Sequence, residues 1–341
     1  MGMNSVYILG AGSSVIAGGP LIGGFKDAAR KTLGRLSPGS GSNQLKEALR
    51  YWDKTIPNAD IEEYYILADL MERLGFEREV QNTRYLIAKT LEESMGMAVS
   101  RTHEDFFNLV YSPNESNATA VISLNWDIAL DRAVTSNRNL WGHYVIDYGV
   151  SKSEPLSAPP IGIASGEGPK FPLFKLHGST NWWFCKECKT LWYATDSKVI
   201  ASYWEGAVPK CTRKDCKGER IPLMVPPTSQ KFESADYVQV LSEIWKNARR
   251  ALSDCDQLVF VGYSFPKTDI QFKMFVKEAL SKNSRLRKIA IITSPKYGST
   301  RLEFENQYSA VFNDSNFESK LRFQYSTFEQ WVEFERCQLP P

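Results

Sequence analysis

The sequence has few histidines, no long hydrophobic run and almost no net charge. Only 3 of its 341 residues are histidine, and 41 lysines and arginines nearly balance 39 aspartates and glutamates, which leaves a formal charge of +2. This balance argues against a dedicated nucleic-acid-binding protein, which carries a basic face. No apolar run approaches the roughly 18 residues of a membrane-spanning helix, and the N-terminal residues lack the order of a signal peptide. We therefore expect a cytoplasmic globular protein that contacts neither nucleic acid nor a membrane directly.

Cysteine is too scarce for a disulfide scaffold, because small secreted scaffolds are short and cysteine-dense and this chain has 6 cysteines in 341 residues. Four of them cluster instead. Cys185 and Cys188 form a CxxC motif, and Cys211 and Cys216 form a CxxxxC motif. Two such knuckles are typical of a tetrahedral zinc site. Four thiolates leave no open position on the metal, so we predict a structural zinc that holds an insertion too small to form its own core.

Short apolar runs predict the strands of a parallel sheet. These runs are Val6–Leu9, Ala120–Ser123, Phe174–Leu176, Leu258–Val261 and Ile289–Ile292, with Leu321–Phe323 as a further edge strand. Helical apolar spacing at Val238–Leu252 and Ile270–Leu280 supplies crossover connections of the kind that parallel strands require. The pattern predicts an α/β fold.

Two insertions interrupt this alternation. The first, residues 38–102, has helical spacing in Ile61–Leu74 and Thr83–Met95 and no convincing strand. The second, residues 182–222, contains the four clustered cysteines. The sheet domain would then comprise residues 1–37, 103–181 and 223–341. Residues 154–172 are rich in proline, glycine and serine, and we interpret them as a loop long enough to cover a site.

A glycine turn follows the first predicted strand. Gly10, Ala11, Gly12, Ser13 and Ser14 would lie between this strand and a helix, where free backbone amides point at a phosphate. The segment is therefore a candidate nucleotide site. Valine replaces the third glycine of the dinucleotide fingerprint, and no second strand ends in an acid about 20 residues on, which argues against an ordinary dehydrogenase. The alternative is a tight turn that binds nothing.

Two further strand ends carry polar side chains. Asn125 can hold a water or a ribose hydroxyl, and Asp127 can accept hydrogen bonds from ribose hydroxyls, although Asp127 could equally cap the helix that follows. His177 lies at the end of another strand and can take up a proton near neutral pH. The alternative for His177 is a structural histidine, which is how we interpret His103 and His143.

The last two predicted core strands also end in small or polar residues. Gly262 and Ser264 follow one strand, and Thr293 and Ser294 end the other. Because the carboxyl ends of parallel strands share one edge, and ligands of α/β proteins bind there, five such ends together indicate a binding site.

The order of these motifs resembles the sirtuin superfamily: GAG-S at the first strand, N-x-D after the second, HG before two cysteine pairs, and G-x-S beyond them. The resemblance implies a Rossmann-like NAD-binding domain and a smaller domain formed by a helical and a zinc-ribbon insertion. It assigns the diphosphate to Gly10, Ala11, Gly12, Ser13 and Ser14, the phosphates and ribose to Gly262 and Ser264, and the adenosine ribose to Thr293 and Ser294. It places Asn125 and Asp127 at the nicotinamide ribose and makes His177 the general base.

The sequence departs from protein-deacylating sirtuins at several positions. Gly18–Leu21 replaces their GIPDFR-like segment, and Leu124 replaces a glutamine. Their peptide-clamping strand corresponds to Ile221–Pro227, where we expect the prolines to prevent such a strand. These features are more similar to divergent bacterial sirtuin-like domains, several of which hydrolyse NAD in antiviral defence.

The resemblance implies an NAD glycohydrolase that releases nicotinamide and ADP-ribose. Asn125 would position a water molecule, and His177 would accept its proton. An NAD-dependent lysine deacylase is the second candidate, and a non-catalytic subunit that senses NAD or ADP-ribose is the third. A defence enzyme must stay silent until infection, so self-assembly into a homo-oligomer or a regulatory protein partner would control it.

Overall fold

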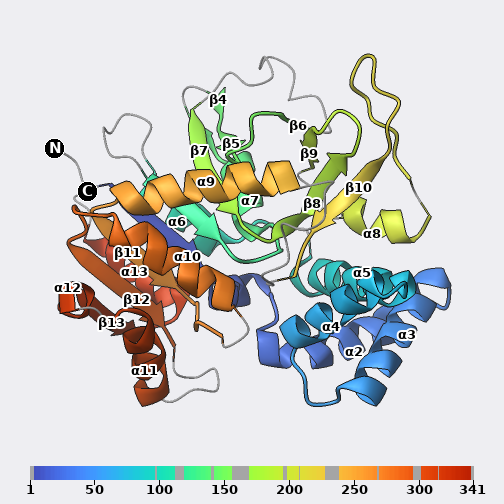
Figure 1. Ribbon diagram of the computed structural model, residues 1–341, viewed down its shortest axis with the longest axis horizontal. Coiled ribbons are helices and arrows are strands. Elements are labelled where there is room, and N and C mark those ends of the chain that lie inside the picture. Colours follow the sequence, from blue (N-terminus) through green and yellow to red (C-terminus); the bar gives the residue numbers. More distant parts are fainter. Residues whose placement is uncertain are drawn as a thin grey trace.

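The computed structural model describes residues 4–96, 98–111, 119–139, 142–155, 169–194, 198–206, 208–226, 238–266, 269–294, 301–313 and 315–338. Within these residues, a large parallel sheet lies beside a smaller helical body, and a second small sheet connects the two (Figure 1).

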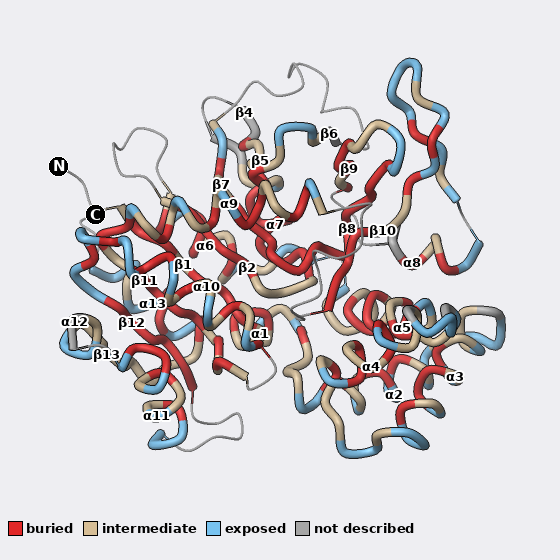
Figure 2. Tube along the Cα trace, viewed as in Figure 1, coloured by how far each residue is buried: buried red, intermediate tan, exposed pale blue. Residues whose placement is uncertain are grey.

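Seven parallel strands form the large sheet. Their spatial order is β13 (Leu321–Tyr325), β12 (Lys288–Thr293), β11 (Gln257–Val261), β1 (Ser5–Leu9), β2 (Thr119–Ser123), β7 (Lys170–Lys175) and β5 (Val145–Asp147). All five predicted core strands and the predicted edge strand are present. The strands β1, β2, β11 and β12 are almost entirely buried (Figure 2), which explains their continuous apolar sequences. The α/β fold with a Rossmann-like parallel sheet is therefore confirmed.

Helices cover both faces of this sheet. Figure 1 shows α9 (Val238–Asp254) and α10 (Ile270–Ser281) in front of it, and α6 (Arg101–Val110) and α13 (Phe328–Cys337) behind it. Further described elements are α1 (Ala11–Ser14), η1 (Val15–Ala17), η2 (Ile22–Gly24), α7 (Ala129–Ser136), β3 (Arg138–Asn139), β4 (Gly142–His143), α11 (Arg301–Val311) and α12 (Ser315–Glu318). None of the described helices combines the length and the apolar character that crossing a bilayer requires.

The smaller body contains α2 (Phe25–Arg35), α3 (Ser40–Thr55), α4 (Ile61–Arg73) and α5 (Glu77–Met95). These helices bury their own core, in which Trp52 stacks on Tyr64 with ring centroids 4.6 Å apart. Phe25 and Ala29 of α2 belong to this core, although α2 precedes the expected boundary at residue 38. The apolar face of α4 and α5 explains why this segment reads as helical in the sequence.

The cysteine insertion packs on the helical body and completes the smaller domain. Its sheet has the order β10 (Arg220–Met224), β8 (Gly178–Cys185), β9 (Leu191–Tyr193) and β6 (Ser153–Pro155), and α8 (Lys198–Trp204) follows β9. Ala201 and Trp204 of α8 and Met224 of β10 enter the core of the helical body. A smaller domain built from a helical and a cysteine-bearing insertion is therefore present.

The structure differs from the sequence interpretation in two details. The proline-containing segment forms strand β10, which pairs antiparallel with β8 and shifts register between Pro222 and Met224. A proline is tolerated here because β10 lies at an edge of the described sheet. In the expected loop 154–172, the first residues complete β6 and the last ones begin β7, and residues 156–168 lie outside the described part of the chain.

Candidate functional site

The polar strand ends meet where the chain order of the sheet reverses. From β1 the sheet continues through β2 and β7 on one side and through β11 and β12 on the other. Open parallel sheets bind ligands outside the carboxyl ends of their strands at such a switch point. The structure therefore brings the five predicted strand ends to one edge, with the ends of β1 and β11 at its centre.

The glycine turns after β1 and β11 pack directly on each other. The amide of Gly10 donates to the carbonyl of Val261 (3.0 Å), and the amide of Gly12 donates to the carbonyl of Gly262 (2.9 Å). A Cβ atom at Gly12 would lie 2.7 Å from the Cα atom of Gly262, which itself has a φ of +61°. The amide of Ser13 donates to the carbonyl of Gly10. Three amides of the turn are thus engaged within the protein, so the glycines permit close backbone packing and these amides are not presented to a phosphate.

Two adjoining pockets open at this edge. The first, which we call the Thr293 pocket, has a volume of about 250 Å³. The second, the His177 pocket, is narrower, with a volume of about 60 Å³. Ala11, Ile22 and Tyr263 line both, so the two pockets share a wall.

The pockets contain almost every residue that the motifs selected. The Thr293 pocket is lined by Ala11, Gly12, Gly262, Ser264, Thr293 and Ser294. The His177 pocket is lined by Gly10, Ala11, Ser14, Asn125, Asp127 and His177. Ser13 lines neither pocket, because it is buried and its hydroxyl donates to the carbonyl of Gly10.

A hydrogen-bond network fixes the polar wall of the His177 pocket. Nδ2 of Asn125 donates to the carbonyl of Gly10 and to Oγ of Ser14, both at 2.9 Å. Oγ of Ser14 donates to Oδ2 of Asp127 (2.7 Å). Oδ1 of Asn125 accepts no hydrogen bond from the described residues, so this oxygen can accept one from a water molecule. The capping alternative for Asp127 also holds, since its Oδ1 accepts the amide of Ala129 at the start of α7 (3.0 Å).

His177 faces an acid that the motifs missed. Its Nε2 lies 4.0 Å from Oδ2 of Asp269, and both side chains are 3% exposed. Asp269 caps α10 by accepting the amide of Phe272, and it accepts a 2.9 Å hydrogen bond from the hydroxyl of Tyr263. In the sequence, an aspartate before a helix indicates only a cap, so nothing there connects it with a histidine 92 positions earlier.

The helical body contributes two further acids that sequence reasoning missed. Asp60, the N-cap of α4, lines the Thr293 pocket, and Glu62 lines the His177 pocket. Burial raises the pKa of Asp60 above its ordinary value. The site is therefore formed by the sheet edge together with one end of α4.

His103 lines neither of these pockets. His103 is buried against Phe328, and its ring lies 2.8 Å from the hydroxyl of Ser100. Burial lowers its pKa to about 4. The side chain of His143 lies outside the described residues.

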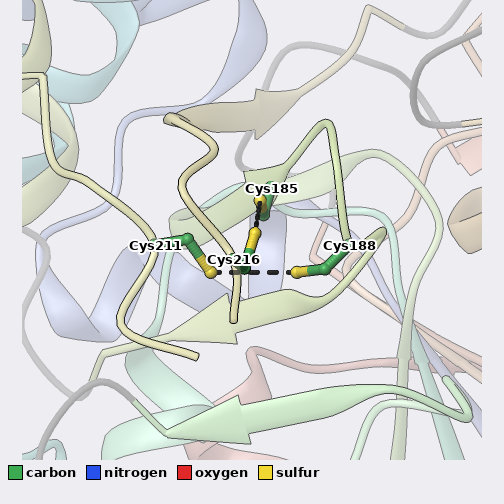
Figure 3. Close-up of side chains that lie close together, drawn as sticks. All are labelled: Cys185, Cys188, Cys211 and Cys216. Carbon is green, nitrogen blue, oxygen red and sulfur yellow. Dashed lines mark hydrogen bonds between the residues drawn. The ribbon is translucent and has the colours of Figure 1, made fainter. Parts of the chain in front are cut away.

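The four clustered cysteines lie together, as their spacing predicts (Figure 3). The Sγ atoms of Cys185 and Cys216 are 3.6 Å apart, and those of Cys188 and Cys211 are 3.7 Å apart. All four sulfur atoms lie within 4.8 Å of one another. A tetrahedral site with Zn–S bonds of about 2.3 Å has edges of about 3.8 Å. The cluster could therefore hold a metal ion, and its geometry fits four-thiolate zinc.

Comparison with known proteins finds structural similarity only. No protein-family model matches the sequence, and no curated protein matches it. A structure of Sir2 enzymes that addresses their mechanism and regulation is 16% identical with a TM-score of 0.46, covering 98% of this chain and 91% of that chain. A Sir2 homologue variant bound to ADP-ribose is 14% identical with a TM-score of 0.48, covering 98% and 90%. A Sir2 structure with a peptide and NAD is 15% identical with a TM-score of 0.41, covering 98% and 91%. At these identities and scores the similarity is one of fold alone and assigns no role to any residue here.

Proposed function

We propose that the protein binds NAD across the two pockets and hydrolyses it to nicotinamide and ADP-ribose. The observation that supports the proposal is the shared wall of the two pockets: His177 lines one of them, and the hydroxyl-bearing residues Ser264, Thr293 and Ser294 line the other. The Thr293 pocket offers the hydroxyls of Ser264, Thr293 and Ser294 to the adenosine ribose and the phosphates. The His177 pocket receives the nicotinamide ribose.

The residues of the His177 pocket match the chemistry of this hydrolysis. Breaking the bond between C1′ of the ribose and the nicotinamide nitrogen gives an oxocarbenium-like centre, and nicotinamide leaves with the bonding electron pair. A water molecule that donates a hydrogen bond to Oδ1 of Asn125 adds its oxygen to C1′. His177 takes the proton that this water releases. Asp127 accepts from the ribose hydroxyls and holds the sugar in place.

We further propose that the four cysteines bind a structural zinc. All four positions on the metal would be filled by thiolates, so the zinc takes no part in the reaction and only stabilises the insertion.

Protein deacylation is the second candidate, and β10 is the observation that favours it. This strand is at an edge of the described small sheet and leads back to the site, because the amide of Val225 donates to the carbonyl of His177. An extended peptide could pair beside β10, although Pro222 offers no amide there.

Incubation of the purified protein with NAD alone separates these functions. A hydrolase releases nicotinamide and ADP-ribose in equal amounts, measured by mass spectrometry, whereas a deacylase releases little without an acylated peptide. His177→Ala should lower nicotinamide release by about 10²–10⁴-fold while NAD binding remains. Undiminished release by this variant would exclude His177 as the base. Binding of NAD without any product, with or without peptide, would instead favour the sensing subunit.

A role in bacterial antiviral defence, which the sequence resemblance implies, adds a condition to this assay. Such an enzyme depends on self-assembly or a regulatory partner, so release should be measured over a range of protein concentrations. A specific activity that rises with concentration indicates control by self-assembly.

A further inference from the structure

The side chains of His177 and Asp269 form a buried pair at the edge of the His177 pocket. At 4.0 Å the two groups are too far apart for a hydrogen bond but within ion-pair distance. Both are 3% exposed, so little water screens their interaction. A negative charge this close favours the protonated imidazole.

The position of Asp269 is fixed by contacts from two elements. Its Oδ1 accepts the amide of Phe272 within α10 (3.2 Å), and its Oδ2 accepts the hydroxyl of Tyr263 after β11 (2.9 Å). Both donors favour a negatively charged carboxylate. Burial, followed by the charge of Asp269, raises the pKa of Tyr263 well above its ordinary value, so its hydroxyl remains a donor.

We propose that Asp269 is a positioning residue for His177, which orients the imidazole and raises the pH at which it takes up a proton. The proposal rests on the proposed function, in which His177 is the base. Two other acids, Asp127 and Glu62, line the same pocket, and Asp127 already accepts hydrogen bonds from Ser14 and Ala129. The test therefore has to change Asp269 alone.

The variant Asp269→Asn removes the charge and keeps a side chain that caps helices well. The titration of His177 is followed by NMR of protein labelled with ¹³C-histidine, and its signal is the one that disappears in His177→Gln. We expect the titration midpoint to fall by about one pH unit in Asp269→Asn. The control is Asp256→Asn, which removes another buried carboxylate. Asp256 lies at the start of β11, and the five residues of this strand separate it by about 17 Å from the strand end at the pocket. Asp256→Asn should therefore leave the titration midpoint of His177 unchanged.

An unchanged midpoint in Asp269→Asn would overturn the proposal. If this variant does not fold, Asp269→Ser replaces it, because serine also caps helices and carries no charge. Enzyme activity gives a second readout. Since the neutral imidazole is the base, the acid limb of kcat/KM for nicotinamide release should move to lower pH by the same amount. A purely structural role would lower the rate without moving this limb.

The NMR titration needs no NAD, so the two proposals can fail separately. A shifted midpoint in a protein that never releases nicotinamide supports the pairing and contradicts the hydrolase. Release of nicotinamide with an unshifted midpoint supports the hydrolase and contradicts the pairing.

Discussion

Alanine at position 12 tests whether the glycine turn serves internal packing or the approach of a ligand. A Cβ atom there would lie 2.7 Å from Cα and 2.9 Å from the carbonyl oxygen of Gly262. These are backbone atoms, which cannot rotate away as a flexible side chain can. Overpacking of this kind costs about 1–3 kcal/mol. In a chain of 341 residues, such a cost lowers Tm by roughly 1–4 °C.

The measurement is thermal unfolding of Gly12→Ala together with titration by NAD. Gly34→Ala is the matched control. Gly34 lies inside α2, and a Cβ atom added there would meet nothing within 4 Å. Alanine should there stabilise the helix by about 0.5–1 kcal/mol. A Gly12→Ala variant that unfolds at the wild-type temperature would refute the packing argument. If this variant kept its Tm and lost NAD affinity, the glycine would serve the ligand.

Three further predictions follow from single residues. Cys185→Ser should unfold or aggregate the protein, whereas Cys337→Ser, at an exposed cysteine of α13, should not. Unchanged melting and metal content, by mass spectrometry, would contradict structural zinc. NADP should bind at least about tenfold more weakly than NAD in titration calorimetry, because Asp60 lines the Thr293 pocket and the described lining residues include no cation. Equal affinities would argue against an adenosine ribose there. Burial lowers the pKa of His103 to about 4, so the unfolded state binds the proton more readily and stability should fall as pH drops from about 6.5 to 4, by up to about 3 kcal/mol. His103→Gln should flatten this dependence of Tm on pH; an unchanged slope would assign it to other groups.

The parts of the fold that follow from local sequence could be predicted. The strands β1, β2, β11 and β12 are buried on both faces, so their apolar runs are continuous and unambiguous. The cysteine cluster could also be predicted, because two short knuckles bring their thiolates together wherever they pack. The shared edge of the strand ends then follows from parallel pairing.

Features that depend on distant contacts could not be predicted. Strands β5 and β6 have three residues each, too few for a periodic pattern, and they exist because β7 and β9 pair with them. The amide of Gly10 donates to Val261, the last residue of β11, and that of Gly12 donates to Gly262, which follows it; both acceptors lie about 250 positions away in the chain. Lys175 is a charged residue within a predicted strand, yet it is 1% exposed; its Nζ pairs with Asp131 (3.1 Å) and donates to the carbonyl of Asp127.

Strand β8 links the cysteine cluster to His177. It begins directly after His177, ends at Cys185, and all eight of its residues are buried. Gly178 has a φ of +73°, and a Cβ there would overlap the carbonyl of Leu223 in β10, so only glycine lets β10 approach so closely. Val225, the residue after β10, contacts the site directly, because its amide donates to the carbonyl of His177. Cys185 is the last residue of β8, and Cys211 and Cys216 precede β10. A metal ion bound by these cysteines would therefore stabilise the backbone that carries His177, although it would lie at the opposite end of β8.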